Sequence, residues 1–198
     1  MKKTITTLWA AILIIVGFTC QNPFATREPE PPQTGQSNWI QPTSPTYVLV
    51  NLKNAVSEKN KSNYLRCLAD TGVSEKEYRF LPEPAVANAN PGVFWEWGKE
   101  AESNYINQMY SFLPADSSIS VTFSRLKETT YQDSVILLQT YQLNFDEKCI
   151  DDCMRRLEGQ AEFRLIRTAD DFWYIYRWSD YSTSDKMTWS ALKARFGK

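Results

Sequence analysis

The pattern of apolar and polar positions changes its period once along the chain. From Tyr47 onward, apolar residues such as Val48, Leu52 and Ala55 recur at the three- and four-residue spacing of an amphipathic helix. After Pro114 the period falls to two, which is typical of strands with one buried and one solvated face. Helices first and strands last predict an α+β domain.

Two helices and a short strand are predicted first. The opening helix starts at Tyr47 and ends at the polar break 58–61, where apolar spacing stops. Residues 78–81 are predicted to form a short strand that prolines then terminate. Between them lies a shorter helix, whose expected buried side is Tyr64, Leu65, Cys67 and Leu68.

A longer helix is expected next. Asn90 and Pro91 would supply its N-cap and a proline at its first position, and the pattern continues toward Tyr110. Its apolar stripe would comprise Trp97, Ala101, Tyr105, Met109 and Phe112.

Four strands are then predicted at 118–127, 134–145, 156–167 and 172–178. The strict alternation within them indicates antiparallel pairing, with helices on one face of a curved sheet. The short connection 169–171 makes the last two strands a hairpin, and a helix at 188–196 is expected to close the domain.

The N-terminus reads as an export signal. Two lysines precede an apolar run at 8–18, which is shorter than the roughly 20 residues that a membrane span needs. The run ends at Gly17-Phe18-Thr19-Cys20, which resembles the lipobox of bacterial lipoproteins. The resemblance implies a signal peptide at 1–19 and fatty acids, such as palmitate, on Cys20. The alternative is an ordinary secretory signal that is discarded together with Cys20.

A proline-rich segment follows Cys20. Residues 20–46 are therefore predicted to comprise the lipidated cysteine and a flexible tether, which its prolines hold extended as a semi-rigid spacer. The folded domain is expected at 47–198. Trp39 and Ile40 stand out in this polar stretch. They are expected to dock on the domain, and the alternatives are that they remain exposed or form a partner-binding motif.

The expected location is the cell envelope, with the lipid anchor holding the chain on a membrane. Asn22, two positions after the lipidated cysteine, is not the aspartate that retains some lipoproteins in the inner membrane. By resemblance this favours the outer membrane.

Composition restricts the chemistry. Hydrophobic residues make up 42% of the chain, enough for a packed core, and the formal net charge is −1. A nearly neutral chain lacks the basic face that nucleic acid requires. Histidine is absent, which removes the commonest metal ligand and the usual acid–base group near neutral pH. No cofactor, metal site or catalytic residue is therefore predicted.

Several short phrases, in order, resemble the NTF2-like (SnoaL-like) superfold, and in particular uncharacterised bacterial lipoproteins of that fold. The resemblance spans roughly residues 45–196. It implies a cone-shaped α+β domain that commonly encloses a cavity, and it leaves the activity open. The matching phrases are Pro45 with Asn51-Leu52 and Ala55, Tyr64 with Cys67-Leu68, Tyr78-Arg79-Phe80 with Pro82, Trp97-Gly98 with Glu100, Asn107-Gln108-Met109-Tyr110, Trp173-Tyr174-Ile175, Trp178-Ser179-Asp180, and Trp189 with Leu192-Lys193.

Aromatic residues are candidates to line such a cavity, although side chains at helix or strand spacing also serve as plain core. The main candidates are Trp97, Tyr105, Trp173 and Trp178, with Trp95, Tyr174 and Tyr176 beside them. Isomerase-like chemistry would need an acid opposite a tyrosine, such as Asp180 and Tyr64, but nothing in the sequence brings these two together. Asp180 is interpreted as a cap of the turn after the last strand.

Cys149 and Cys153 lie between two predicted strands. In an oxidising compartment they could form a disulfide, and free thiols or a metal site are the alternatives. Cys67 is expected to be a buried thiol that packs as a small hydrophobe.

These patterns favour a membrane-anchored, non-catalytic module that binds an unknown protein or an apolar small molecule. Two other functions stay open: an isomerase- or cyclase-like enzyme with a carboxylate in the cone, and a structural homodimer of the envelope.

Overall fold

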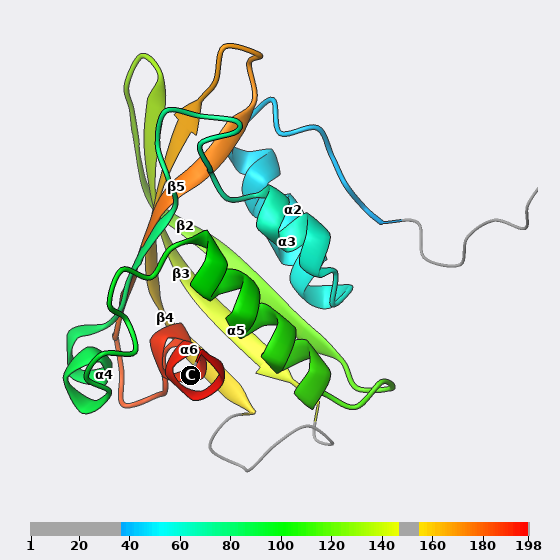
Figure 1. Ribbon diagram of the computed structural model, residues 1–198, viewed down its shortest axis with the longest axis vertical. Coiled ribbons are helices and arrows are strands. Elements are labelled where there is room, and N and C mark those ends of the chain that lie inside the picture. The colour runs from blue at the N-terminus through cyan, green and yellow to red at the C-terminus, as the bar shows by residue number, and fades with distance from the viewer. Residues whose placement is uncertain (1–36, 147–154, 198) are drawn as a thin grey trace, which may run out of the picture. The chain divides into compact units, whose positions relative to one another are not determined.

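A five-stranded sheet, in the order β1-β5-β4-β3-β2, forms the frame of the domain (Figure 1). The computed structural model describes residues 37–146 and 155–197. The strands are β1 (Arg79–Leu81), β2 (Ile119–Thr130), β3 (Ser134–Phe145), β4 (Arg156–Arg167) and β5 (Trp173–Tyr181). Strands β2 to β5 pair antiparallel, as predicted, whereas β1 runs parallel to β5 and makes the sheet mixed.

Helices cover one face of this curved sheet (Figure 1). The helices are α2 (Pro45–Ser57), α3 (Lys61–Arg66), α4 (Pro84–Ala89), α5 (Lys99–Phe112) and α6 (Trp189–Phe196). α2 packs on β2 and β5, and α6 contacts both α5 and β4. The α+β class expected from the change of period is confirmed.

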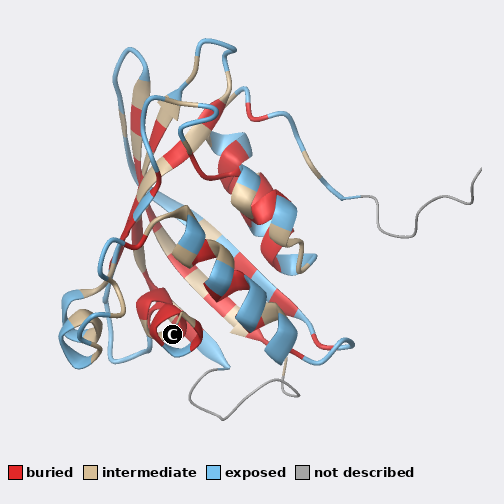
Figure 2. Ribbon diagram, viewed as in Figure 1, coloured by how far each residue is buried: buried red, intermediate tan, exposed pale blue. Residues whose placement is uncertain are grey.

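The strand alternation decides which side chains face the helices. In β3 every second residue from Val135 to Phe145 is buried, and the residues between them are only partly covered. β4 repeats this pattern opposite β3, so the two strands present one continuous buried surface, which is apolar except near Gln139. The buried residues of helices and strands meet in the space between them (Figure 2). Its largest fully buried side chains include Trp97, Trp178 and Trp189.

The helix expected to begin at Asn90-Pro91 begins at Lys99 instead. Residues 91–96 form turns, because Gly92 (φ 84°) and Glu96 (φ 51°) adopt left-handed backbone conformations that interrupt a right-handed helix. Trp97 therefore precedes the helix rather than lying on it.

The short helix α4 was not predicted. Pro84, interpreted as part of a strand terminator, stands at its first position, and Glu83 caps it by accepting from the N–H groups of Ala85 and Val86. At the other end of α5, Phe112 is 50% exposed rather than part of the core stripe.

The end of the predicted tether lies against the domain, since residues from Ser37 onward belong to one compact unit. Asn51 of α2 pairs with the backbone of Ile40 in both directions, at 2.8 and 2.6 Å. The guanidinium of Arg66 stacks 3.9 Å above the ring of Trp39, which is half-buried.

Three of the cysteines discussed above, Cys20, Cys149 and Cys153, lie outside the described residues. Cys67 is buried and free, and its thiol donates to the carbonyl of Asn63 at 3.3 Å. In the parts of the chain that the structure describes, none of the helices combines the length and apolar character needed to cross a bilayer.

Candidate functional site

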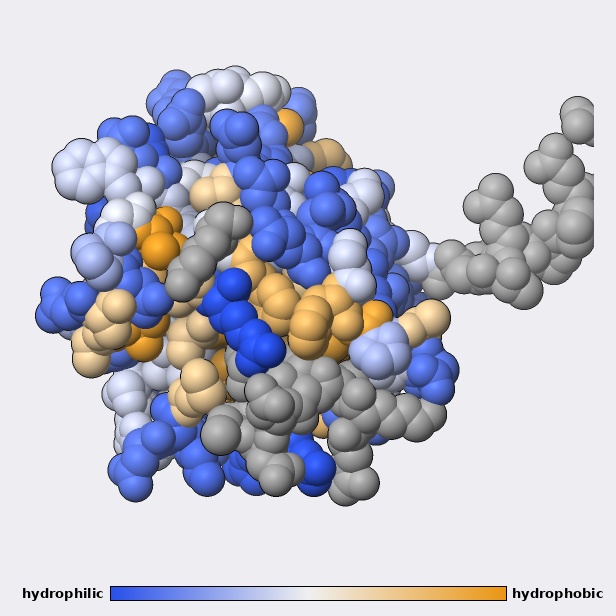
Figure 3. All heavy atoms as spheres, turned by 60° about the horizontal axis from the view of Figure 1, so that its bottom comes forward, coloured by the Kyte–Doolittle hydropathy of each residue, from blue (hydrophilic) through white to orange (hydrophobic). Residues whose placement is uncertain are grey.

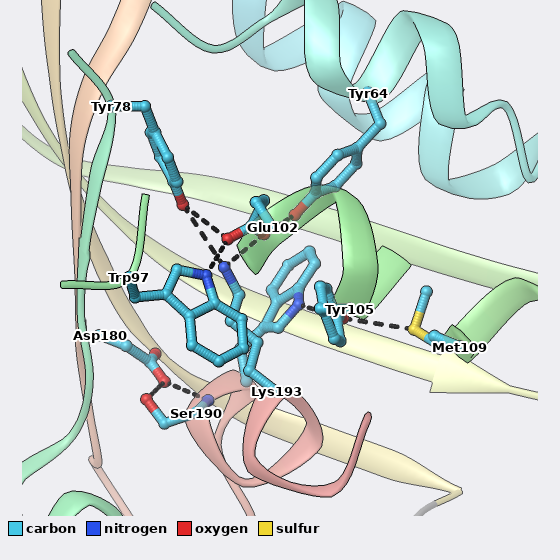
Figure 4. A network of polar contacts seen from close by, with 10 residues as sticks. Tyr64, Tyr78, Trp97, Glu102, Tyr105, Met109, Asp180, Ser190 and Lys193 are labelled. Atoms are coloured by element: carbon cyan, nitrogen blue, oxygen red, sulfur yellow. Dashed lines mark hydrogen bonds and ion pairs between the residues drawn. The ribbon is translucent and has the colours of Figure 1, made fainter. Parts of the chain in front are cut away.

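A buried ion pair occupies the space between the sheet and the helices (Figure 4). Glu102 of α5 and Lys193 of α6 are 2.6 Å apart, Oε1 to Nζ, and neither side chain has any exposed surface. Glu102 is the first buried residue of α5, one turn before Tyr105, and Lys193 is buried beside Leu192 on α6. The two helices thus deliver opposite charges to one point.

The Glu102 carboxylate accepts from three further donors. The hydroxyl of Tyr64 donates to Oε1 at 2.6 Å. The hydroxyl of Tyr78 and the indole N–H of Trp97 donate to Oε2, at 3.1 and 2.6 Å. With Lys193 this makes four donors, about as many as the lone pairs of a carboxylate can accommodate.

The Lys193 ammonium lies within an aromatic cage. Its Nζ is 3.7 Å from the ring centroid of Phe80 and 4.2 Å from that of Trp178. The rings of Tyr105 and Trp97 lie farther away, at 5.4 and 5.8 Å. Aromatic faces attract a cation, and Glu102 favours its charge. Burial nevertheless prevails and lowers the pKa of Lys193 to about 8.

A second buried carboxylate, Asp180, lies within β5 and holds α6 against it. It accepts from the hydroxyl of Tyr141 at 2.8 Å, and from the N–H and hydroxyl of Ser190 at 2.7 and 2.5 Å. Burial raises its pKa, although these hydrogen bonds oppose the shift. The interpretation of Asp180 as a cap of the turn after the strand was wrong: it instead receives an N–H from the first turn of α6.

Gly159 makes room for this second cluster. Inward-facing on β4, it has the hydroxyl of Tyr141 directly above it, and that hydroxyl also accepts from the N–H of Trp189 at 2.7 Å. A Cβ at position 159 would lie 2.6 Å from the carbonyl oxygen of Tyr181 and 2.8 Å from the Tyr141 oxygen. Only a residue without Cβ fits.

We therefore expect Gly159→Ala to lower the free energy of unfolding by about 1–3 kcal/mol, the usual cost of overpacking. Urea unfolding followed by tryptophan fluorescence measures the change. Gly72→Ala is the matched control, because its Cβ would meet only the end of the partly exposed Asp70 side chain, at 3.1 Å. Equal losses in both variants would contradict the role given to Gly159.

Three of the four main residues expected to line a cavity instead surround the buried Lys193, and the fourth is buried elsewhere in the core. Trp97, Tyr105 and Trp178 surround Lys193, and Trp173 is buried at the start of β5. Of the secondary candidates, Trp95 is 83% exposed, whereas Tyr174 and Tyr176 are half-buried.

The proposed acid–tyrosine couple is not brought together. Tyr64 donates to Glu102, whereas the tyrosine bonded to Asp180 is Tyr141. Among the described residues, no group of three or more acidic or cysteine side chains could hold a metal ion.

Sequence reasoning missed Glu102 and Lys193, the two residues at the centre of the site. The available signal was a charged residue on the core face of each of two amphipathic helices, one acidic and one basic. Lys193 follows Trp189 by four residues and precedes Phe196 by three, which is core spacing.

Comparison with known proteins identifies the fold. No protein-family model and no curated protein matches the sequence. Among solved structures, an NTF2-like superfamily protein from Salmonella enterica serovar Typhimurium superposes with a TM-score of 0.50 at 8% identity, covering 71% of this chain and 89% of that one. The chain has the NTF2-like fold.

Two more structures extend this likeness. A conserved protein from Planctomyces limnophilus gives a TM-score of 0.51 at 15% identity, over 69% of this chain and 91% of its own. A Novosphingobium aromaticivorans protein, provisionally described as an aromatic ring hydroxylase, gives 0.51 at 12% identity, over 70% and 86%. At such identities the likeness shows the NTF2-like fold and leaves activity open.

Proposed function

We propose that this chain is a lipid-anchored protein of the bacterial cell envelope whose NTF2-like domain is a non-catalytic binding module. The anchor is supported by the apolar run at 8–18 and by Cys20 directly after it. Several acyl chains on one cysteine give stable membrane attachment, since each buried methylene contributes about 0.8 kcal/mol.

The observation that carries the non-catalytic assignment is the occupation of the cone by the chain's own side chains. An enzyme of this fold would need an interior carboxylate that reaches its substrate. Glu102 already accepts from four protein donors and Asp180 from three. Both carboxylates therefore act in packing α5 and α6, which argues against the isomerase- or cyclase-like alternative.

A surface groove between α4 and α6 supports the binding role. Its volume is about 540 Å³, and apolar side chains gather on this face of the molecule (Figure 3). Such a surface suits a partner protein or an apolar ligand. The groove is lined by Ala85, Val86, Ala89, Asn90, Met187, Ala191, Ala194 and Arg195.

Mass spectrometry of the native product, isolated from its own membranes, tests the anchor. We expect a mature chain that begins at an acylated Cys20, and a Cys20→Ser variant that leaves the membrane fraction. Asn22→Asp is the matched variant: it keeps the acyl chains, and by resemblance to the lipoprotein sorting signal it should move the protein to the inner membrane. An unacylated start downstream of position 20 would refute the anchor.

A further inference from the structure

Three arginines form a row across neighbouring strands on the face of the sheet that the helices leave open. Arg79 of β1 stands opposite Arg177 of β5, and Arg177 stands opposite Arg164 of β4. The next pairs in the same register, Phe80 with Trp178 and Trp178 with Phe163, are buried in the core. Because strand side chains alternate, the arginines point outward.

A bulge in β5 contributes to this arrangement. The register with β4 shifts between Arg164 and Leu165, so that Tyr176 is the extra residue and Tyr176 and Arg177 are both only partly covered. The ammonium of Lys76 stacks 4.4 Å above the Tyr176 ring and adds a fourth cation. Together these side chains line a shallow cavity of about 540 Å³, whose full lining is Lys76, Glu77, Arg79, Arg164, Tyr176 and Arg177.

The row carries unbalanced positive charge. Arg164 pairs with Glu162 at 2.8 Å, and Arg79 reaches Glu77 at 3.8 Å and the carbonyl of Glu96 at 3.1 Å. The guanidinium of Arg177, at the centre, has no acid or hydrogen-bond acceptor among the described residues. Like charges directly opposite each other destabilise a sheet, so the row weakens the free protein.

We infer that this arginine row binds a phosphoryl anion, either free phosphate groups or the headgroup phosphates of a lipid. Guanidinium groups match phosphate oxygens in geometry and charge. Adjacent strands lie about 4.8 Å apart, so three arginines in a row suit an anion with several oxygens, such as a diphosphate. The site goes beyond the proposed function, and it stands whether or not Cys20 is acylated.

Calorimetric titration of the full chain carrying Cys20→Ser with inorganic pyrophosphate tests the inference. We expect Arg177→Gln to weaken binding about 10–100-fold, the effect of losing charge-assisted hydrogen bonds. Arg156→Gln is the matched control, because Arg156 lies on β4 and pairs with Glu158 outside the row. Equal weakening in both variants would show general charge attraction and overturn the site.

Thermal unfolding gives a second readout, in which the substitution that weakens ligand binding should not lower the stability of the free protein. Without ligand, Arg177→Gln should melt at or above the temperature of the parent chain, because like-charge repulsion is relieved. With pyrophosphate, the parent chain should gain more stability than the variant, because it binds the ligand more tightly. A variant that is less stable without ligand would assign Arg177 to packing instead.

Flotation with vesicles separates the two sources of phosphate. A lipid headgroup is identified if the parent chain binds vesicles of equimolar phosphatidylglycerol and phosphatidylcholine but not vesicles of phosphatidylcholine alone. The Arg177→Gln variant should then lose this binding. Binding of pyrophosphate alone identifies a free phosphate ligand. Failure of both probes, or equally tight binding of citrate, overturns the inference and leaves the test of Cys20 untouched.

Discussion

Replacing Lys193 with methionine is expected to lower the free energy of unfolding by about 3–5 kcal/mol, the cost of breaking a buried ion pair by removing one partner. Methionine fills a similar volume, so the loss reports on charge rather than on packing. It leaves the Glu102 carboxylate buried with hydrogen-bond donors but without a cation. A loss of this size is a large part of the stability of a typical domain.

Urea unfolding measures this loss, and a double-mutant cycle isolates the pair. Adding Glu102→Gln to Lys193→Met removes both charges, so the double variant should be more stable than the sum of the single losses predicts. Lys53→Met, at an exposed position of α2, should change stability by no more than about 0.5 kcal/mol. If Lys193→Met were as stable as this control, the ion pair would contribute nothing to the free energy of unfolding.

The pH dependence of Glu102→Gln adds an independent check. Burial already holds the pKa of Lys193 at about 8, below its ordinary value, and loss of Glu102 should lower it further. Above the folded-state pKa the unfolded chain binds more protons, so the stability of this variant should rise with pH until Lys193 also titrates in the unfolded chain. The Lys193→Met variant should lack this rise.

The strands were predictable because each one has a single buried face. β3 and β4 match the predicted ranges 134–145 and 156–167, since alternation at period two depends only on which face is wet. The parallel pairing of β1 was not foreseen, because nothing in residues 78–81 specifies a partner strand more than ninety positions away.

The start of α5 and the centre of the site were beyond the local pattern. The local chemistry of Asn90-Pro91 is that of a helix start. The tertiary packing of the turns that follow overrides this preference, and it places the indole N–H of Trp97 in a hydrogen bond to Glu102. The core spacing of Glu102 and Lys193 alone could not identify the ion pair, because burying either charge is unfavourable until the other is known to face it. The aromatic residues were recognised, but not the ion pair that they enclose.

Replacing Asp180 with alanine should lower the free energy of unfolding by about 2–4 kcal/mol, because buried donors of Tyr141 and Ser190 lose their acceptor. Asp180→Asn keeps the shape and one acceptor oxygen, so it should lose less. The effect is expected to concentrate on α6, whose first turn depends on this carboxylate. Measured by amide hydrogen exchange, Asp180→Ala should accelerate exchange relative to the wild type more in α6 than in α2.

The direction of the Asp180 pKa shift fixes how stability should change with pH. Burial raises the folded-state pKa above the ordinary 3.8, so the folded protein takes up this proton at higher pH than the unfolded chain. The stabilisation is fully present below the unfolded-state pKa and is lost as pH rises through the folded-state pKa. Wild type should therefore gain stability relative to Asp180→Asn, which does not titrate, as pH falls through this interval. The reverse trend would mean that the hydrogen bonds from Tyr141 and Ser190 outweigh burial.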